Sequence, residues 1–300
     1  MNEVAAIVVT YNRKDMLLGC INHLVQLQGD KADILIIDNA STDGTKDALD
    51  SLIDANKITY CNTGENLGGA GGFQFGMKEA LKRGYKYLWL MDDDVNPSPD
   101  SLSSLLKADR DLNGNYGFLS SIAKWTDGSV CKMNIQKISL KKPIDDYESP
   151  TVPVIMATFV SFFVKADTVM QYGLPIKEFF IWADDLEYSR RLSLKMPCYA
   201  VNGSVVIHNM ASNNKTGIEH EHKDRLWRYK YLYRNEVYLY HREGIKARFY
   251  LFLRVNLHVA RVIFKARENK MEKIRVIFKS YSSGFKFKPQ IEYFKNADVV

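Results

Sequence analysis

Three consecutive carboxylates, Asp92, Asp93 and Asp94, follow an apolar run at 86–91 that is rich in Leu, Trp and Tyr. Such a run predicts a buried strand, and a core does not accept unpaired carboxylates, so we expect the acids at the strand's end. Alternate side chains share a face in an extended chain, so Asp92 and Asp94 should point together and Asp93 away. Clustered carboxylates suit a hard cation such as Mg²⁺ or Mn²⁺, which in turn binds a nucleotide diphosphate. The alternative is an acidic loop before a helix.

The elements that would position these acids begin at the N-terminus, where strand-like and helix-like segments alternate. Apolar runs at 4–9, 34–37 and 58–61 predict short strands, and the spacing between them predicts helices. This alternation is typical of an α/β protein with a doubly wound, mostly parallel sheet flanked by helices. Asn12 fits the N-cap of the first helix. Further along, we expect a strand at 154–164, a short helix at 166–172 and a strand at 199–207.

Polar residues follow the first two predicted strands. Thr10 and Arg13 come after the first strand, and Asp38 comes after the second. In such sheets ligands bind outside the carboxyl ends of the strands, so we expect these residues and the acidic cluster along one rim. Asp38 could accept hydrogen bonds from a base or a ribose, or it could only shape the turn.

A glycine-rich segment, ENLGGAGG at 65–72, precedes a helical stretch. No Gly-Lys-Ser/Thr follows it, and Gln74 stands where a dinucleotide-binding pattern needs its third glycine, so both phosphate fingerprints are excluded. Missing side chains would let backbone N–H groups approach a ligand near a helix N-terminus. The alternative is a flexible connector.

Two more acids, Asp184 and Asp185, follow an aromatic segment and open a helical pattern. Asp184 has the capping-box spacing to Glu187, but a cap needs only one acid. Asp185 could be a general base, because partial burial would raise its proton affinity, or it could belong to a structural network. His208 ends the strand predicted at 199–207, where it could supply a nitrogen ligand to the cation or be an ordinary core histidine.

Charge divides the chain into two parts. From residue 216 onward there are 19 Lys/Arg against 9 Asp/Glu, a net of +10, whereas residues 1–215 carry 22 against 26, a net of −4. We therefore expect a catalytic domain at 1–215 and a mainly helical, basic and aromatic region at 216–300. Such a region suits an anionic membrane surface, and packing on protein is the alternative. We expect no nucleic-acid partner, although stacking aromatic and basic residues occur in such proteins.

The cysteines and the N-terminus bear on cellular location. Cys20, Cys61, Cys131 and Cys198 are scattered without metal-ligand spacing, which indicates reduced thiols. The start MNEVAAIVVTYNR lacks signal-peptide features, and no segment has the apolar length of a spanning helix. We expect a cytoplasmic protein, with peripheral attachment to the inner face of the cell membrane and self-association both left open.

Five motifs together resemble the inverting glycosyltransferases of family 2, which have the GT-A fold. The resemblance covers roughly residues 3–215. It rests, in this order, on IVVTYNR at 7–13, IIDNASTDGT at 36–45, NTGENLGGAGG at 62–72, LMDDDV at 90–95 and FIWADDLEYSRR at 180–191. Each motif is common alone, and their order and spacing make the resemblance specific.

The resemblance implies roles for the residues already named. Those that would hold the donor nucleotide are Thr10, Arg13, Asp38, Asn66 and Asp92. Asp92 and Asp94, with His208 as third ligand, would bind Mn²⁺ or Mg²⁺. Asp185 would deprotonate the acceptor hydroxyl.

Within the family, the triple aspartate and the sequence from Trp182 to Glu187 look most like the galactofuranosyltransferases, which use UDP-galactofuranose. The acceptor implied is a saccharide or a lipid-linked saccharide in surface polysaccharide synthesis. The chain is shorter than the polymerising mycobacterial members, which favours transfer of one or a few sugar residues over polymerisation. The alternatives are a rhamnosyltransferase that uses a dTDP-sugar and, in another class, a nucleotidyltransferase that makes a nucleotide-sugar.

Overall fold

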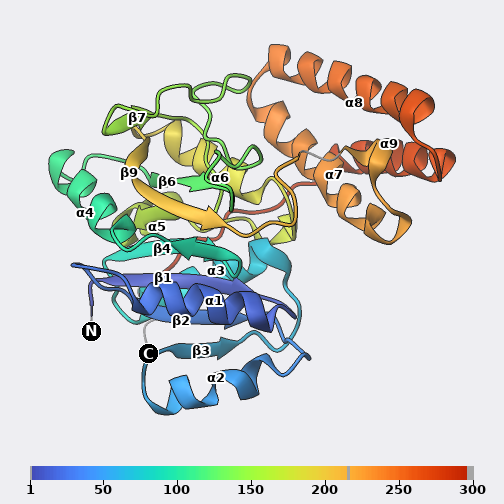
Figure 1. The fold of residues 1–300 in the computed structure, drawn as a ribbon. Coiled ribbons are helices and arrows are strands. Elements are labelled where there is room, and N and C mark those ends of the chain that lie inside the picture. Colours follow the sequence, from blue (N-terminus) through green and yellow to red (C-terminus); the bar gives the residue numbers. More distant parts are fainter. Residues whose placement is uncertain (1, 215–216, 296–300) are drawn as a thin grey trace.

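One mixed sheet organises the chain in the computed structural model, which describes residues 2–214 and 217–295 (Figure 1). Its strands are β1 (Val4–Thr10), β2 (Asp33–Asp38), β3 (Thr59–Asn62), β4 (Tyr87–Asp92), β5 (Val95–Pro97), β6 (Leu119–Lys124), β7 (Thr151–Pro153), β8 (Phe162–Lys165) and β9 (Tyr199–His208). The spatial order is β3-β2-β1-β4-β8-β6-β9-β5, and β7 pairs with β9. The strands β3, β2, β1 and β4 are parallel, while β8 is antiparallel to both β4 and β6.

Helices cover both faces of this sheet. They are α1 (Lys14–Val25), α2 (Thr45–Asp54), α3 (Gly68–Lys82), α4 (Ser101–Asp111), α5 (Ala166–Tyr172) and α6 (Asp184–Ser193). Alternate residues of β1 belong to two separate cores, one built with α1, α2 and α4 and the other with α3, α5 and α6. Alternation in β1 therefore separates the two layers of helices. The expected α/β architecture, with a central, mostly parallel sheet flanked by helices, is confirmed.

The C-terminal region is helical, as expected. It contains short 3₁₀ turns at η2 (Ile218–His220) and η3 (Lys223–Arg225), followed by α7 (Leu226–Arg242), α8 (Ile245–Lys265) and α9 (Lys270–Gly284). These three helices form their own apolar cluster to one side of the sheet (Figure 1). The boundary predicted between residues 215 and 216 lies outside the described residues. Among the described residues, no helix combines the length and apolar content needed to cross a bilayer.

Two local expectations were wrong. The apolar run at 154–164 is largely buried but irregular, and only its end enters β8; within the run, Ala157 donates its N–H to Ser189 Oγ at 3.1 Å instead of to a strand. Apolar character there reflects burial, which does not distinguish a strand from a buried loop. Asn12 does not cap α1, because its Oδ1 accepts the N–H of Thr42 at 2.7 Å. In addition, β6 lies in a part of the chain for which the sequence predicted no element.

A buried ion pair joins α6 to the C-terminal helices. Arg190 on α6 donates from Nε to Glu243 Oε1 at 2.6 Å and from Nη2 to Oε2 at 2.9 Å. Only 17% of the Arg190 side chain and 9% of the Glu243 side chain are exposed. Both carboxylate oxygens are thus used in a largely dry contact between the two regions.

Replacing Glu243 should therefore destabilise the whole chain. We expect Glu243→Ala to lower the free energy of unfolding by about 2–3 kcal/mol, because it leaves the Arg190 guanidinium buried without its partner. Urea unfolding followed by circular dichroism measures the change. The control is Asp50→Ala, which breaks the exposed Lys46–Asp50 pair and should cost about 0.5 kcal/mol or less. Equal effects of both variants would contradict the coupling.

Candidate active site

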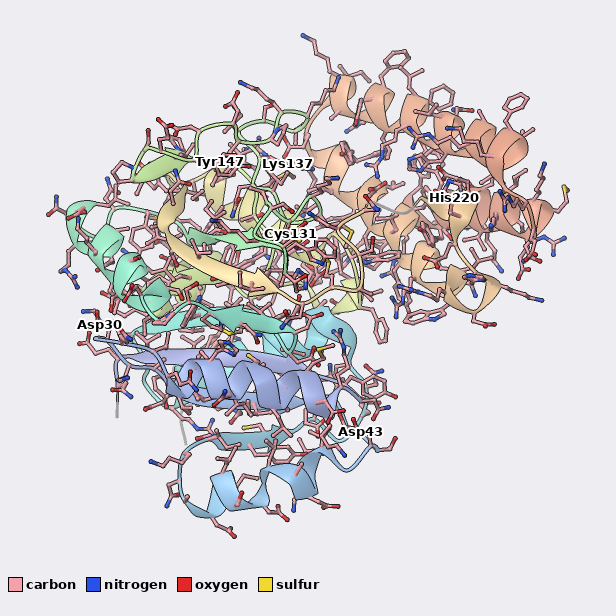
Figure 2. The ribbon with its side chains drawn as sticks, in the orientation of Figure 1. Asp30, Asp43, Cys131, Lys137, Tyr147 and His220 are labelled. Carbon is pink, nitrogen blue, oxygen red and sulfur yellow. The ribbon has the colours of Figure 1, made fainter. Side chains whose placement is uncertain are left out.

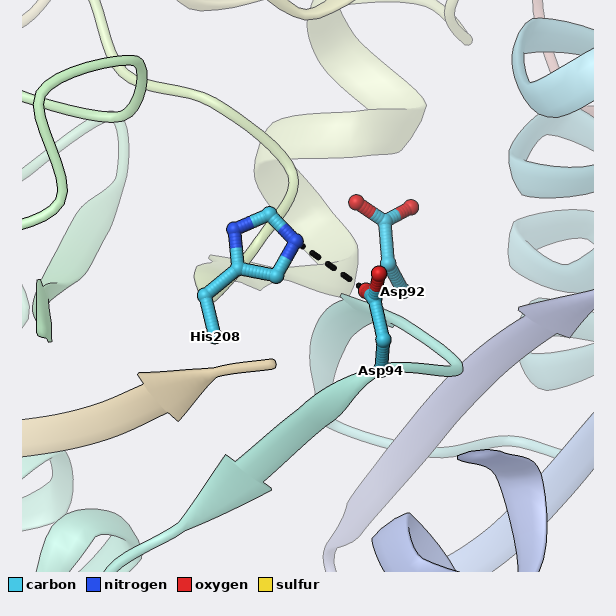
Figure 3. A group of neighbouring side chains, drawn as sticks. All are labelled: Asp92, Asp94 and His208. Atoms are coloured by element: carbon cyan, nitrogen blue, oxygen red, sulfur yellow. Dashed lines mark hydrogen bonds and ion pairs between the residues drawn. The ribbon is translucent and has the colours of Figure 1, made fainter. Parts of the chain in front are cut away.

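The acids at the C-terminal end of β4 lie close to His208, the last residue of β9. The chain turns at residues 93–94 between β4 and β5, and β5 runs antiparallel to β9 with Val95 opposite His208. His208 Nε2 lies 3.0 Å from Asp94 Oδ1. One ligand atom from each of Asp92, Asp94 and His208 lies within 4.8 Å of the others (Figure 3). The expected convergence of Asp92 and Asp94 is therefore present, although Asp94 lies in the turn and not in the strand.

The electrostatics of this cluster depend on burial. Burial and the neighbouring Asp94 charge raise the pKa of Asp92 to about 7. Burial alone would also raise the pKa of Asp94, but its bonds to His208 and Arg13 outweigh burial and hold the pKa below its usual value. Burial disfavours the charged imidazole of His208, yet Asp94 raises its pKa to about 10. Within the described part of the chain nothing donates a hydrogen bond to the Asp92 carboxylate. Two carboxylates and an imidazole in this arrangement fit a divalent cation.

Asn134 completes the surroundings of His208. Its Oδ1 lies 2.9 Å from His208 Nδ1, and its Nδ2 donates to Thr158 Oγ1 at 3.1 Å. Because the Asn134 oxygen can only accept, Nδ1 carries a proton, and with the raised pKa Nε2 carries a second proton that it donates to Asp94. When the imidazole is neutral its lone pair lies on Nε2, which is the nitrogen that a cation would take. Nothing in the sequence pattern indicated Asn134, since no element or motif was predicted around it.

Asp93 faces the end of β1 and contacts two rim residues. Thr10 Oγ1 donates to Asp93 Oδ2 at 2.7 Å. Arg13 bridges the acids, from Nη1 to Asp93 Oδ1 at 2.9 Å and from Nη2 to Asp94 Oδ2 at 2.8 Å. With 45% of its side chain exposed, Arg13 also faces solvent at the rim. Thr10 and Arg13 therefore hold the acidic turn in place, and their contact with a nucleotide stays a prediction.

Asp38 and Asn66 lie at two other points of the rim. Asp38 pairs with Thr10 in the β1–β2 register and is fully buried, where its Oδ1 accepts the Ser41 N–H at 2.8 Å and its Oδ2 accepts the Tyr60 hydroxyl at 2.6 Å. Asn66 is exposed, and its Oδ1 accepts the Gly68 N–H at 2.9 Å. Both side chains thus shape turns in this structure. Their contacts with a donor nucleotide remain untested.

Asp184 and Asp185 occupy the first turn of α6. The capping box considered for Asp184 and Glu187 is absent, because the N-cap is Ala183 and Glu187 instead accepts from Arg191 at 3.0 and 3.1 Å. Burial, followed by the charge of Asp184, raises the pKa of Asp185 well above its usual value, and Asp92 adds to the effect. Burial raises the pKa of Asp184 to about 6. The acids of α6 and those after β4 therefore share one electrostatic environment.

A strained segment leads into α6. Phe180, Trp182 and Ala183 have φ of 63°, 65° and 65°, which is unfavourable for residues with a Cβ. Asn235 of α7 is fully buried and points its Nδ2 at the carbonyls of Phe179 and Trp182, both at 2.9 Å. The Ile181 carbonyl also lies 3.2 Å from this nitrogen. Asn235 therefore holds the backbone that places Asp184 and Asp185.

The glycine-rich segment supports the same strained turn from the other side. Gly68 begins α3 with φ of +71°, and a Cβ there would lie 2.2 Å from the Phe180 carbonyl oxygen. The Ala70 N–H donates to that oxygen at 3.2 Å. Gly72 and Gly76 pack directly against side chains of β1 and β2. These glycines permit close packing, so the flexible-connector alternative is wrong.

Aromatic side chains of α7 cover this turn. Phe180 stacks on Tyr231 with ring centroids 4.9 Å apart and meets Trp227 edge-on at 6.2 Å. Trp182 meets Tyr229 at 5.1 Å. Trp227 is 39% exposed, so part of this aromatic group faces solvent near the start of α6. The sequence showed these aromatic residues but not which segment they cover.

The only feature of the sequence that could have pointed to Asn235 was a polar residue within an aromatic helix.

Loss of the Asn235 amide should loosen the turn before α6. We expect Asn235→Ala to lower the free energy of unfolding by about 2–3 kcal/mol, because buried carbonyls lose their donor. Hydrogen exchange should also become faster at Ala70, whose N–H bonds to the Phe180 carbonyl. Asn256→Ala, at an exposed position on α8, is the control and should change neither quantity. Unchanged exchange at Ala70 in Asn235→Ala would contradict a positioning role.

Two curated proteins are similar to parts of this chain. The galactofuranosyltransferase GlfT1 of Mycolicibacterium smegmatis is 26% identical over 199 residues, which is 63% of this chain and 65% of that protein. The chain thus spans just under two thirds of that relative's length. The undecaprenyl-phosphate mannosyltransferase of Micrococcus luteus is 36% identical over 116 residues, 36% of this chain and 44% of that protein.

The fold is also that of solved glycosyltransferases. A crystal structure of GalNAc-T7 with UDP, GalNAc and Mn²⁺ superposes with a TM-score of 0.64 at 13% identity, covering 94% of this chain and 56% of that one. At this identity the likeness establishes the fold alone. The profile of "Glycosyl transferase family 2" matches residues 5–168, more than half of the chain. This stretch includes β1, β2, the glycine-rich segment and the acids after β4. The chain therefore belongs to glycosyl transferase family 2.

Proposed function

We propose that this glycosyltransferase transfers a sugar, with inversion, from a nucleoside diphosphate to an acceptor hydroxyl, and that Asp92, Asp94 and His208 hold a divalent cation, Mn²⁺ or Mg²⁺. The observation that carries the proposal is the convergence of these three residues, with the acids of α6 in the same electrostatic environment. Asp94 is buried and pairs with Arg13 and His208, whereas the half-buried Asp92 beside it has no such partner among the described residues, and neighbouring carboxylates are costly without enough positive charge. A bound cation would supply the positive charge that these carboxylates lack, and it would in turn bind the negatively charged diphosphate.

On the donor side, the chain's own groups arrange charge around the diphosphate. A bound divalent cation would neutralise the negative charge that develops on the leaving diphosphate. Asn134 keeps the proton of His208 on Nδ1, so that Nε2 can coordinate. Arg13 holds the Asp93–Asp94 turn and presents its exposed side to the rim. Thr10, Asp38 and Asn66 are proposed to position the nucleotide.

On the acceptor side, Asp185 is the proposed base. Burial and the neighbouring Asp184 raise the pKa of this carboxyl, which makes its carboxylate a stronger proton acceptor than an exposed aspartate. The carboxylate would take the proton of the acceptor hydroxyl as the oxygen attacks the anomeric carbon from the face opposite the diphosphate. Trp227 and Phe180 offer a partly exposed aromatic surface beside this point. A sugar ring could pack on such a surface.

The proposed donor is UDP-galactofuranose, and the proposed acceptor is a saccharide or lipid-linked saccharide. The match to the mycobacterial galactofuranosyltransferase spans 63% of this chain, and the triple aspartate and the acids of α6 have the pattern expected for that group. A polyprenyl-phosphate mannosyltransferase is the second candidate, favoured by the 36% identity to the Micrococcus luteus protein over a shorter stretch. A dTDP-sugar donor has no relative among these matches in its favour. Family membership argues against a nucleotidyltransferase.

A panel of UDP-, GDP- and dTDP-sugars, with mass detection of the product, tests the donor and the metal together. We expect UDP-galactofuranose to give the highest kcat/KM, with UDP release abolished by a chelator and restored by Mn²⁺ or Mg²⁺. Asp94→Asn and His208→Asn should each weaken the apparent metal affinity by about 100-fold or more, because each removes or weakens a direct ligand, and even partners that only orient ligands contribute about 10- to 100-fold. Asp111→Asn, at an exposed acid on α4, is the control. Activity that persists after chelation would remove the metal role.

The base assignment has its own test. Asp185→Asn should bind donor nucleotide as tightly as the parent protein, measured by calorimetry, yet lose transfer by about 10²–10⁴-fold, because only proton abstraction is removed. Asp167→Asn is a matched control, since Asp167 is also an acid in the first turn of a helix but is exposed on α5. Near-parental turnover in Asp185→Asn would assign the base elsewhere.

A further inference from the structure

Helix α8 has one face fastened to the rest of the molecule. Arg254 Nη2 donates to Glu236 Oε1 of α7 at 2.6 Å, and Tyr233 OH lies 2.9 Å from His258 Nδ1. Burial and the nearby Arg254 and Arg261 lower the pKa of His258 to about 4, so this imidazole is neutral in the contact. The buried apolar residues of α8 are Ala247, Leu251, Val255 and Val262. The inner face is thus satisfied by α7 and α9.

The opposite face of α8 is apolar and exposed. Its large side chains recur at helical spacing and have exposed fractions of 46–83%; they are Phe249, Phe252, Leu253, Leu257, Ile263 and Phe264. The helix lies at the outer edge of the molecule, and aromatic rings project from it away from the sheet (Figures 1 and 2). Scattered exposed apolar residues are normal, but six along one helix face indicate a binding surface.

The charges around this face have one sign. Residues 245–267 contain no Asp or Glu. The exposed basic residues of this stretch are Lys246, Arg248, Arg261, Lys265 and Arg267. A second copy of the same face would bring two basic surfaces together, which like-charge repulsion disfavours. A partner for this face must combine an apolar phase with negative charge.

We propose that α8 docks in the interfacial layer of a bilayer that contains anionic lipids, with its phenylalanines and leucines among the acyl chains and its Lys and Arg residues at the headgroups. A helix with this division of faces lies in the membrane plane, where apolar burial and attraction to anionic headgroups add. Its basic residues make it unsuitable for spanning, in agreement with the absence of a spanning helix among the described residues.

Helix α7 connects α8 to the proposed active site. It binds α8 through Glu236 and, one residue earlier, holds the turn before α6 through Asn235. Docking α8 on a bilayer would therefore hold the base segment, through α7, at the membrane that carries a lipid-borne acceptor. This role in presenting the acceptor rests on the proposed function, whereas the binding of α8 to vesicles does not.

Flotation of the full chain with vesicles, without donor or acceptor, tests the proposal. The vesicles are phosphatidylcholine alone or phosphatidylcholine with phosphatidylglycerol. We expect binding to the anionic vesicles that weakens in high salt and is much weaker on neutral ones. Phe252→Ser with Leu257→Ser should lower the partition coefficient by about tenfold or more, because two apolar side chains lose their buried position. Arg261→Gln with Lys265→Gln should lower it by about tenfold on anionic vesicles only.

The control variant is Val25→Ser with Leu194→Ser, whose side chains are 48% and 58% exposed, similar to the 51% and 49% of Phe252 and Leu257. It should bind vesicles like the parent chain. No binding by the parent chain, or parental binding by the α8 variants, would overturn the proposal. Light scattering gives a third outcome that would overturn it. If Phe252→Ser with Leu257→Ser converted an oligomer into a monomer while vesicle binding stayed unchanged, the exposed face of α8 would join two copies of the chain. Transfer to a water-soluble acceptor should persist in every variant, which separates failure of docking from failure of the proposed function.

Discussion

The acidic turn after β4 is the constraint on which the rest of the site depends. Asp92 ends the largely buried strand β4, Asp93 and Asp94 follow in the turn, and each of the three meets a different environment. The Arg13 guanidinium pairs with both Asp93 and Asp94, and Asp94 also pairs with His208. Within the described chain, neither Arg13 nor His208 donates a hydrogen bond to Asp92. Burial makes an unneutralised carboxylate expensive, so this turn is stable in one geometry and retains a demand for positive charge.

The second constraint is the strained turn before α6. Three residues with left-handed backbone angles are held between Gly68 on one side and Asn235 on the other. Strain of this kind persists only where surrounding contacts overdetermine the backbone. Because Asn235 belongs to α7, the C-terminal helices are part of what positions Asp184 and Asp185. The two-region division by charge is real in composition, but the site draws on both regions.

The same C-terminal helices divide their surfaces between two tasks. The inner side of α7 carries neutral and paired polar groups that hold the turn, while the outer side of α8 carries apolar and basic residues. Membrane association and packing on protein were alternatives for the sequence of this region. The structure shows the packing, on the inner side of the helices, and leaves the outer face of α8 exposed, because an amphipathic helix bundle buries only part of each helix. Membrane docking of that face stays a proposal.

The sequence by itself determined the α/β class, the order of the first strands and helices, and the family, because periodicity and local motifs are properties of neighbouring residues. It also indicated Asp92, Asp94, His208 and Asp185, whose types and positions at element ends stand out. Only the tertiary structure decided which of these meet: the antiparallel β5–β9 pair brings His208 to Asp94 across more than a hundred residues. The roles of Asn134 and Asn235 could not be predicted from the sequence for the same reason, since an asparagine acquires its role from the distant groups that folding places around its amide.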